Sequence, residues 1–124
     1  MPPPTARNTL FVYGTLKSGR AAHHMLAGSR YVGRAKTRPV YRLRDMGPYP
    51  AMVRDEADGM AVRGELWDVD DETLELLDEY EGIEEGLYER VEIALADGGS
   101  AQGYLFRGEV PGGTASGEEW PFAE

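Results

Sequence analysis

The pattern of hydrophobic and polar positions along the chain predicts mostly short strands. Runs rich in β-branched and aromatic residues, separated by glycine, proline and short polar stretches, are typical of strands that end in tight turns. Such runs occupy residues 9–13, 30–37, 40–44, 60–69, 87–95 and 101–106. The sequence Asp97-Gly98-Gly99 predicts a hairpin between the last two runs, and Gly47-Pro48-Tyr49-Pro50 predicts a rigid turn.

Two segments, residues 21–26 and 71–81, have the pattern of short helices instead. Asp70 is a suitable N-cap for the second helix, and Gly82 is a suitable residue beyond its C-cap. On a helical wheel at about 100° per residue, one side is apolar and is predicted to pack inward. That side consists of Leu74, Leu76, Leu77 and Tyr80, and the water-facing side carries Asp71, Glu72, Glu75, Asp78 and Glu79.

The order of these elements excludes a doubly wound parallel fold, because strand and helix do not alternate throughout. We expect an α+β fold with a mixed, strongly curved or barrel-like β-sheet and two short helices. With 124 residues the chain fits one domain, residues 1–124, and no internal repeat or linker divides it. The expected ordered core is about residues 9–108, and the tail 109–124, rich in Gly, Pro, Ser and Glu, is expected to be loose.

Composition narrows the class of protein and of chemistry. Apolar residues make up 41% of the chain, yet no apolar run approaches the roughly 20 residues that a membrane span needs, and no signal segment opens the sequence. We therefore expect a cytoplasmic protein without membrane contact. The chain has no cysteine and only two histidines, His23 and His24, so it predicts neither a thiolate nucleophile nor a metal site.

The net charge of −9 argues against nucleic-acid binding, because affinity for a phosphate backbone requires a basic surface. The charge is unevenly distributed. Residues 1–54 carry ten Lys/Arg and one acid, a net +9, whereas residues 55–124 carry three Arg and 21 acids, a net −18. Two oppositely charged halves attract each other when they interleave in one fold. The alternative interpretation is a basic face that attracts an anionic ligand, such as a small carboxylate.

One acidic residue breaks the helical pattern. On the wheel Glu81 falls at about 340° from Leu74, between Leu77 and Leu74, on the side predicted to pack inward. A partly desolvated carboxylate has a raised proton affinity, and near neutrality it serves as a general acid and base. Glu81 is therefore the candidate catalytic residue. The alternative is that the helix frays near Gly82 and leaves Glu81 in water.

The turn Tyr13-Gly14-Thr15-Leu16, where the first predicted strand ends, is the candidate binding element. Consecutive backbone N–H groups in such a turn bind a carboxylate or an oxyanion without a charged side chain. The alternative is an ordinary connection after a strand that contains one glycine.

These residues resemble the γ-glutamylcyclotransferase-like proteins, in particular the small AIG2-like branch that includes γ-glutamylamine cyclotransferase. The matching stretches, in the family's order, are FVYGTLKSG at 11–19, PYP at 48–50, VRGELWDV at 62–69, LDEYEG at 77–82 and LYER at 87–90. The resemblance implies a mixed α+β fold with a small barrel and a cavity. In that cavity the turn Tyr13–Leu16 holds the α-carboxylate end of a γ-glutamyl group. The resemblance assigns the catalytic acid/base to Glu81, which closes the Leu-Asp-x-x-Glu motif. It also implies that Tyr88 orients the ligand, with a packing role as the alternative.

The resemblance also implies an enzyme that needs no cofactor or metal. Its substrate is a small γ-glutamyl compound whose α-amino group attacks its own γ-amide carbonyl, releasing 5-oxoproline and an amine. Glu81 moves protons from the attacking nitrogen to the departing one. Two other interpretations stay open: a non-catalytic module that binds a small carboxylate metabolite, and a related enzyme that removes a γ-glutamyl protecting group during biosynthesis.

The remaining aromatic residues are expected to have structural roles. His23 matches a family position and is expected to hydrogen-bond near the turn rather than to catalyse, and His24 is expected at the surface. Trp67, Tyr80 and Tyr104 are expected to pack in the core or at its rim. The chain lacks the extra segments with which larger members of the family select glutathione or γ-glutamyl amino acids.

Overall fold

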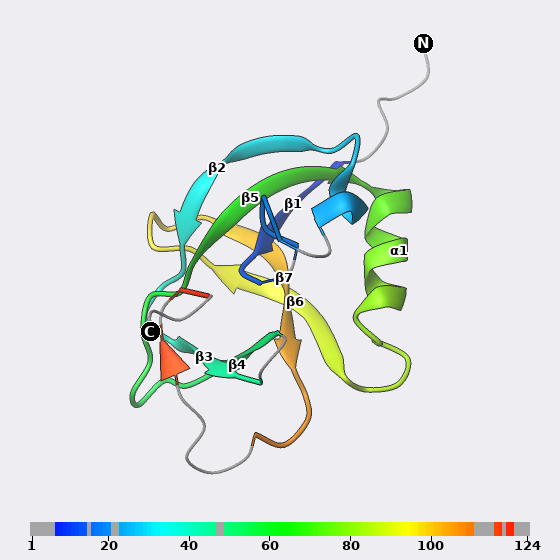
Figure 1. The fold of residues 1–124 in the computed structure, drawn as a ribbon. Coiled ribbons are helices and arrows are strands. Elements are labelled where there is room, and N and C mark those ends of the chain that lie inside the picture. The colour runs from blue at the N-terminus through cyan, green and yellow to red at the C-terminus, as the bar shows by residue number, and fades with distance from the viewer. Residues whose placement is uncertain are drawn as a thin grey trace.

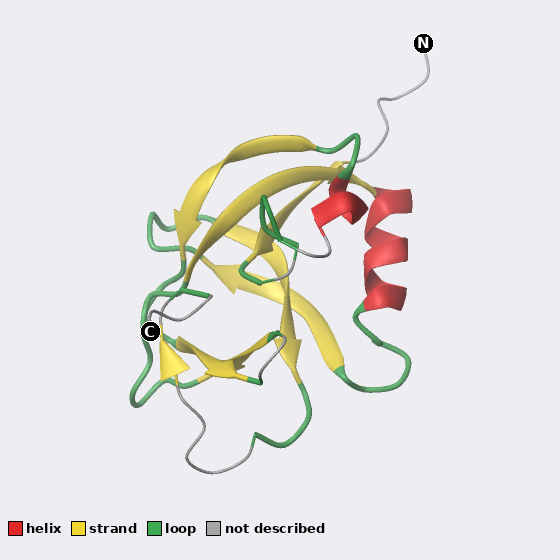
Figure 2. Cartoon of the chain, viewed as in Figure 1, coloured by secondary structure: helices red, strands yellow, loops and turns green. Residues whose placement is uncertain are grey.

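The computed structural model describes residues 7–14, 16–20, 23–46, 49–110, 116–117 and 119–120. The elements are, in chain order, β1 (Arg7–Val12), the 3-10 helix η1 (His23–Leu26), β2 (Arg30–Lys36), β3 (Tyr41–Asp45), β4 (Pro50–Arg54), β5 (Arg63–Asp70), α1 (Asp71–Tyr80), β6 (Tyr88–Ala94), β7 (Ser100–Phe106) and β8 (Ser116–Gly117). Figures 1 and 2 show both helices together on one side of the strands. None of the helices in these ranges is long and apolar enough to cross a membrane.

The main sheet has five strands in the order β2-β5-β1-β7-β6. Neighbouring strands are antiparallel except for β1 and β7, which are parallel, with Leu10 opposite Gln102. The sheet curls until its two edges meet at one bridge, between Thr37 after β2 and Leu95 after β6. Over the described residues it does not close into a continuous barrel. This confirms the expected α+β class with a mixed, strongly curved sheet.

A second sheet has the order β4-β3-β8. Strand β4 was not predicted, because its first three residues are all buried and show no alternation. Pro50 starts the strand, where proline is tolerated, and Gly47 and Pro48 of the predicted turn lie outside the described residues. Strand β8 belongs to the segment that was expected to be loose, yet it pairs with β3 through Leu43–Gly117 and Arg44–Ser116.

The core is divided between the two faces of β1. Its alternate side chains point to opposite sides, as in any strand. One cluster, against the helices, contains Leu10, Val12, Leu16, Leu26, Trp67, Val69, Leu74, Leu77 and Tyr104. The other cluster contains Phe11, Tyr13, Tyr41, Leu43, Met52, Val62, Ile93, Leu95, Ala101 and Leu105. Strand β1 therefore connects both halves of the core, and its last residues lead directly into the predicted binding turn.

Both ends of α1 follow the sequence prediction. The Asp70 side chain accepts a hydrogen bond of 2.8 Å from the Thr73 amide, which makes Asp70 the N-cap. At the other end Gly82 has a φ of +70°, a left-handed conformation that glycine adopts without strain. The shorter helix is a 3-10 helix, η1, described over His23–Leu26, and residues 21 and 22 of the predicted segment lie outside the described residues.

The inward side of α1 is narrower than the wheel predicted. Leu74 and Leu77 are buried, but Leu76 is 56% exposed and Tyr80 is 50% exposed, so the prediction was wrong for these two residues. The backbone of the helix lies nearest to β1, β5 and η1, and its buried stripe is centred between Leu74 and Leu77. Within the described part of the chain, the helix packs against the rest of the protein on one side only, and this contact covers fewer residues than the helical wheel marks as apolar.

Candidate active site

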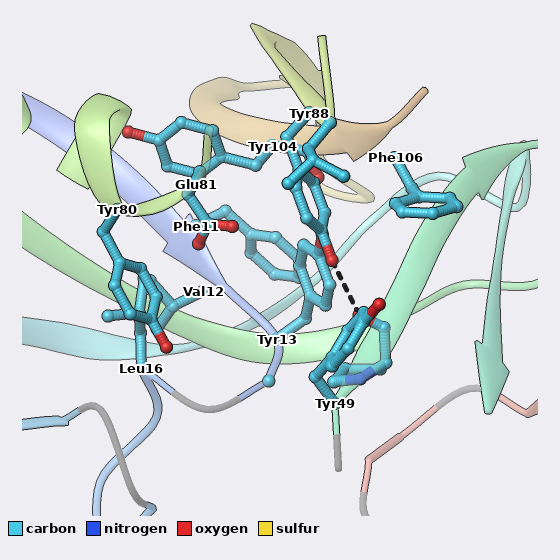
Figure 3. Close-up of a pocket in the computed structure, with 13 residues that line it drawn as sticks. Phe11, Val12, Tyr13, Leu16, Tyr49, Tyr80, Glu81, Tyr88, Tyr104 and Phe106 are labelled. Carbon is cyan, nitrogen blue, oxygen red and sulfur yellow. Dashed lines mark hydrogen bonds between the residues drawn. The ribbon is translucent and has the colours of Figure 1, made fainter. Parts of the chain in front are cut away.

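A pocket of about 460 Å³ lies between the end of β1, the end of α1 and the strands β6 and β7 (Figure 3). It brings together five of the six predicted site residues, and the sixth, Thr15, lies outside the described residues. The five are Tyr13, Gly14, Leu16, Glu81 and Tyr88. The rest of the wall is apolar or aromatic: Phe11, Val12, Tyr49, Pro50, Tyr80, Leu87, Tyr104 and Phe106. Among these described lining residues, Glu81 has the only side chain that carries a charge.

The end of α1 places Glu81 in this pocket. Glu81 is the C-cap, and its amide donates a 2.8 Å hydrogen bond to the Leu77 carbonyl. The Ile83 amide donates to the Asp78 carbonyl at 3.2 Å, and the Gly82 amide donates to the Glu79 carbonyl at 3.1 Å. This pair of bonds is the Schellman motif, which fixes the backbone on both sides of Glu81. In Figure 3 the carboxylate points into the pocket, toward β1.

The environment of the Glu81 carboxylate raises its proton affinity. Burial raises the pKa of Glu81 from 4.5 to about 7. Within the described residues the carboxylate accepts no hydrogen bond. A carboxylate with such a pKa exists in both protonation states near neutral pH, which is what a group that takes up and returns a proton requires.

The tyrosines around Glu81 direct their hydroxyl protons elsewhere. Tyr13 donates to the Tyr104 carbonyl at 2.6 Å, Tyr88 donates to the Pro50 carbonyl at 3.2 Å, and Tyr104 donates to the Asp78 carboxylate at 2.7 Å. Burial, followed by the charge of Glu81, also raises the pKa of Tyr88 well above its usual range. The tyrosines therefore stay neutral, and the lone pairs of Glu81 remain available to a ligand.

The turn after β1 is held by a carboxylate on the neighbouring strand. The Lys17 amide donates a 3.0 Å bond to the Gly14 carbonyl, which closes the turn. Glu65 Oε1 accepts from the Ser18 amide at 2.9 Å, from the Ser18 hydroxyl at 3.2 Å and from Trp67 Nε1 at 3.2 Å. Glu65 on β5 therefore holds the end of the turn at Ser18, while Gly14 and Leu16, earlier in the same turn, line the pocket.

Gly14 is required by a close approach to β4. A Cβ atom at this position would lie 2.8 Å from Pro50 Cγ and 2.9 Å from Pro50 Cδ, closer than real contacts allow. The Pro50 carbonyl in turn accepts the Tyr88 hydroxyl. Gly14, Pro50 and Tyr88 therefore form one packed wall. Sequence reasoning included Pro50 in the family resemblance without assigning it to the site.

The histidines lie where the sequence predicted them. His23 Nδ1 is 2.9 Å from the Leu16 carbonyl oxygen, to which it hydrogen-bonds, and its ring packs edge-on against Trp67 at 5.1 Å. His24 is exposed. In the part of the chain that the structure describes, no three His, Cys, Asp or Glu side chains gather in a way that would hold a metal ion.

Sequence reasoning missed the role of Asp78, which it placed on the water-facing side of the helix. The Asp78 carboxylate instead accepts hydrogen bonds from Tyr104 and from Arg90 on β6. The helical wheel does indicate that Asp78 is near the protein interior, because it falls at about 40° from Leu74, next to the buried stripe. The sequence analysis did not identify Tyr104 and Phe106 as pocket-lining residues. They lie two positions apart on β7, and residues at this spacing point to the same side of a strand.

A family model described as "Gamma-glutamyl cyclotransferase, AIG2-like" matches residues 10–122. The chain belongs to this family. Gamma-glutamylaminecyclotransferase A of Danio rerio is 31% identical over 109 residues, which cover 78% of this chain and 66% of that protein. Gamma-glutamylaminecyclotransferase of Homo sapiens is 35% identical over 96 residues, which cover 69% of this chain and 60% of that protein. This chain therefore spans less than two thirds of the length of either relative.

Solved structures of AIG2-like proteins have the same fold. The crystal structure of an AIG2-like protein from Mus musculus superposes with a TM-score of 0.76 at 25% identity, covering 92% of this chain and 88% of that one. A uropathogenic E. coli-specific protein superposes with a TM-score of 0.80 at 26% identity, covering 91% of this chain and 89% of that one. These matches confirm the family resemblance seen in the sequence.

Proposed function

We propose that this AIG2-like protein is a γ-glutamyl cyclotransferase that converts a small γ-glutamyl amine into 5-oxoproline and a free amine. The observation that carries the proposal is the Glu81 carboxylate, partly buried, with a pKa of about 7 and without a donor among the described residues, in a pocket lined by the turn after β1. The names of the Danio rerio and Homo sapiens relatives support the same chemistry.

The turn offers a place for the α-carboxylate of the substrate. Gly14 and Leu16 line the pocket, and their amides donate to no acceptor among the described residues. Free backbone amides bind a carboxylate without a charged side chain. With the carboxylate at this turn, the α-ammonium group of the same substrate points toward Glu81, and the γ-amide lies between them.

The reaction needs a proton carrier and no protein nucleophile. Glu81 removes a proton from the α-ammonium group, and the freed amine attacks the γ-carbonyl carbon of the same molecule. The new C–N bond closes the five-membered lactam, and the old amide C–N bond breaks. The α-nitrogen loses two protons in all, and Glu81 passes both in turn to the departing nitrogen, which leaves as an ammonium ion. Glu81 returns to its starting state.

The wall of the pocket favours an amine without a carboxylate of its own. Apart from Glu81, the described lining residues are uncharged, and Tyr49, Leu87 and Phe106 among them offer aromatic or aliphatic surface. The carboxylate of a departing amino acid or dipeptide would be desolvated here without a cation to pair with. γ-Glutamyl alkylamines should therefore react faster than γ-glutamyl amino acids or glutathione.

The direct test is turnover, measured as 5-oxoproline by mass spectrometry. The panel contains γ-glutamyl alkylamines, γ-glutamyl-ε-lysine, γ-glutamyl amino acids and glutathione. Glu81→Gln keeps the shape of the side chain but cannot carry a proton, so we expect kcat to fall by at least about 100-fold. Glu79→Gln, an exposed residue of the same helix, is the control and should keep full activity. Binding of the panel without any product would show a non-catalytic module and overturn the proposal.

A further inference from the structure

A second cleft, of about 570 Å³, lies on the other half of the turn, between residues 17–20 and the strands β2 and β5. Five basic side chains line it: Lys17, Arg20, Arg34, Lys36 and Arg63. Among the described residues, two acidic side chains join them, Glu65 and Glu119. The described lining side chains therefore carry an excess of three positive charges, in a chain whose net charge is −9. A local excess of this sign in an acidic protein attracts anions from solution.

Glu65 is already engaged with the protein itself, and the charge of Glu119 acts on Lys17. Glu65 accepts the hydrogen bonds of Ser18 and Trp67 described above. Glu119 belongs to the C-terminal segment, which reaches the cleft from outside: Lys17 Nζ donates a hydrogen bond to the Trp120 carbonyl, and the Arg20 guanidinium lies 5.8 Å from the centre of the Trp120 ring. A carboxylate of the chain itself thus occupies one side of the cleft, and space remains beside it.

Two cations of the cleft, Arg34 and Lys36, have no partner of opposite charge among the described residues. Neither Arg34 nor Lys36 forms an ion pair or a side-chain hydrogen bond with another described residue. They are two positions apart on β2, so their side chains leave the same face of the strand. Burial, together with the charges of Arg20 and Arg34, lowers the pKa of Lys17 against the opposing influence of Glu119. The cations therefore repel one another, and an added anion would relieve this repulsion.

We propose that this cleft binds a ligand through a diphosphate group. At neutral pH a diphosphate carries about three negative charges, which matches the excess of positive charge lining the cleft. The guanidinium groups of Arg20 and Arg34 present paired donors that fit phosphate oxygens, and Lys36 adds a point charge. The volume of the cleft is typical of a small-molecule site.

The ligand would contact the same turn that lines the aromatic pocket. Lys17 and Ser18 face the cleft, while Gly14 and Leu16 face the pocket. Binding of a diphosphate at one half of the turn is therefore expected to alter substrate binding at the other half. The cleft proposal itself does not depend on catalysis, because its test measures binding alone.

The test is calorimetric titration of the whole protein with inorganic pyrophosphate at low ionic strength. We expect saturable binding of one equivalent. The double variant Arg34→Gln/Lys36→Gln should bind at least about tenfold more weakly, because two charge-assisted contacts are lost. Arg30→Gln is the matched control: Arg30 lies on the same strand, its side chain is 76% exposed and it does not line the cleft, so its affinity should stay within about twofold. Glu119→Gln should strengthen binding by removing a competing carboxylate.

Two further ligands separate phosphate chemistry from charge alone. Citrate carries a similar charge and should bind more weakly than pyrophosphate; equal affinity would overturn the assignment to a diphosphate. ADP tests the source of the group: binding at least as tight as pyrophosphate identifies a nucleotide, whereas weaker binding identifies free pyrophosphate. Absence of saturable pyrophosphate binding, or equal losses in the Arg30 variant and the double variant, would overturn the site. Thermal melting of each variant confirms that it is folded.

Discussion

Arg90 holds Asp78 through two hydrogen bonds, from Nε to Oδ1 at 2.8 Å and from Nη2 to Oδ2 at 3.1 Å. The Tyr104 hydroxyl adds a third bond to the same carboxylate. Asp78 is three residues before Glu81 and its carbonyl is part of the Schellman motif, so this ion pair anchors the end of α1 to β6 and β7. The position of Glu81 therefore depends on contacts outside the pocket.

A second group of hydrogen bonds ties the start of α1 to the sheet. Arg90 also donates to Gln102 Oε1, Gln102 Nε2 donates to Asn8 Oδ1 at 3.0 Å, and Asn8 Nδ2 donates to Asp71 Oδ1 at 2.9 Å. Both ends of the helix are thus connected to β1, β6 and β7 through one chain of side chains. Such a network restricts rotation of the helix about its own axis.

We predict that Asp78→Asn lowers kcat about tenfold while the pH at which activity is half-maximal stays near 7, because Asp78 positions Glu81 without touching the substrate. The variant should lose only about 1–2 kcal/mol of stability, since both side chains are partly exposed. Steady-state kinetics across pH, with urea unfolding, measure both effects. Glu75→Gln, an exposed acid of the same helix, should change neither. Full kcat in Asp78→Asn would contradict the positioning role.

Glu81 makes the folded protein less stable as pH rises. Its pKa is about 7 when folded and its ordinary value is 4.5, so the folded state binds more protons between these two values. Stability is therefore unaffected by Glu81 below pH 4.5 and falls as the pH rises from 4.5 through 7, by an amount on the order of 3 kcal/mol.

It follows that Glu81→Gln should be more stable than the wild type at pH 8 and equally stable near pH 4. The measurement is the free energy of unfolding in urea for both proteins at a series of pH values. Glu79→Gln should track the wild type throughout. A Glu81→Gln curve that runs parallel to the wild type at every pH would show that the carboxylate is hydrated in the folded state.

Gly14→Ala tests the wall formed by Gly14, Pro50 and Tyr88. The added methyl group would lie 2.8 Å from the Pro50 ring, so β4 must move away from the turn. We expect a loss of about 1–3 kcal/mol in stability and a rise in KM larger than the fall in kcat, because the binding turn moves and Glu81 does not. Tyr88→Phe, which only removes the hydrogen bond to the Pro50 carbonyl, should produce a smaller change in the same direction.

Gly82→Ala and Gly86→Ala form a matched pair. Both glycines have a positive φ, +70° and +76°, so an alanine at either position costs about 1 kcal/mol of strain. A Cβ at Gly82 would also lie 2.9 Å from Leu87 Cδ1, whereas a Cβ at Gly86 would meet nothing within 4 Å. We expect both variants to be destabilised but only Gly82→Ala to lose activity, because only Gly82 adjoins Glu81. Equal activity in the two variants would show that the backbone conformation at Gly82 does not control the position of Glu81.

The sequence predicted those features that depend on local patterns. The N-cap at Asp70, the positive φ of Gly82 and the hairpin after Asp97 all follow from the preferences of single residues in a turn or at a helix end. The helical wheel also placed Glu81 between Leu74 and Leu77, the two residues of α1 that are buried. The chemical role of Glu81 remains a proposal.

The missed features depend on contacts between distant parts of the chain. Strand β4 exists because β3 pairs with it along five residues, and its buried run has no alternation by which to recognise it. Asp78 pairs with Arg90, twelve residues later, after a turn whose path a single sequence does not reveal. Leu76 is exposed although its residue type favours burial, because the described elements cover α1 on the side of Leu74 and Leu77.

The parallel pairing of β1 with β7 has a consequence for synthesis on the ribosome. Leu10 and its partner Gln102 are 92 residues apart, and the pocket takes its walls from both strands. A nascent chain therefore has no complete pocket until β7 has emerged, long after β1. Long-range pairing of this kind slows folding, because one edge of β1 has no neighbouring strand until β7 has been made.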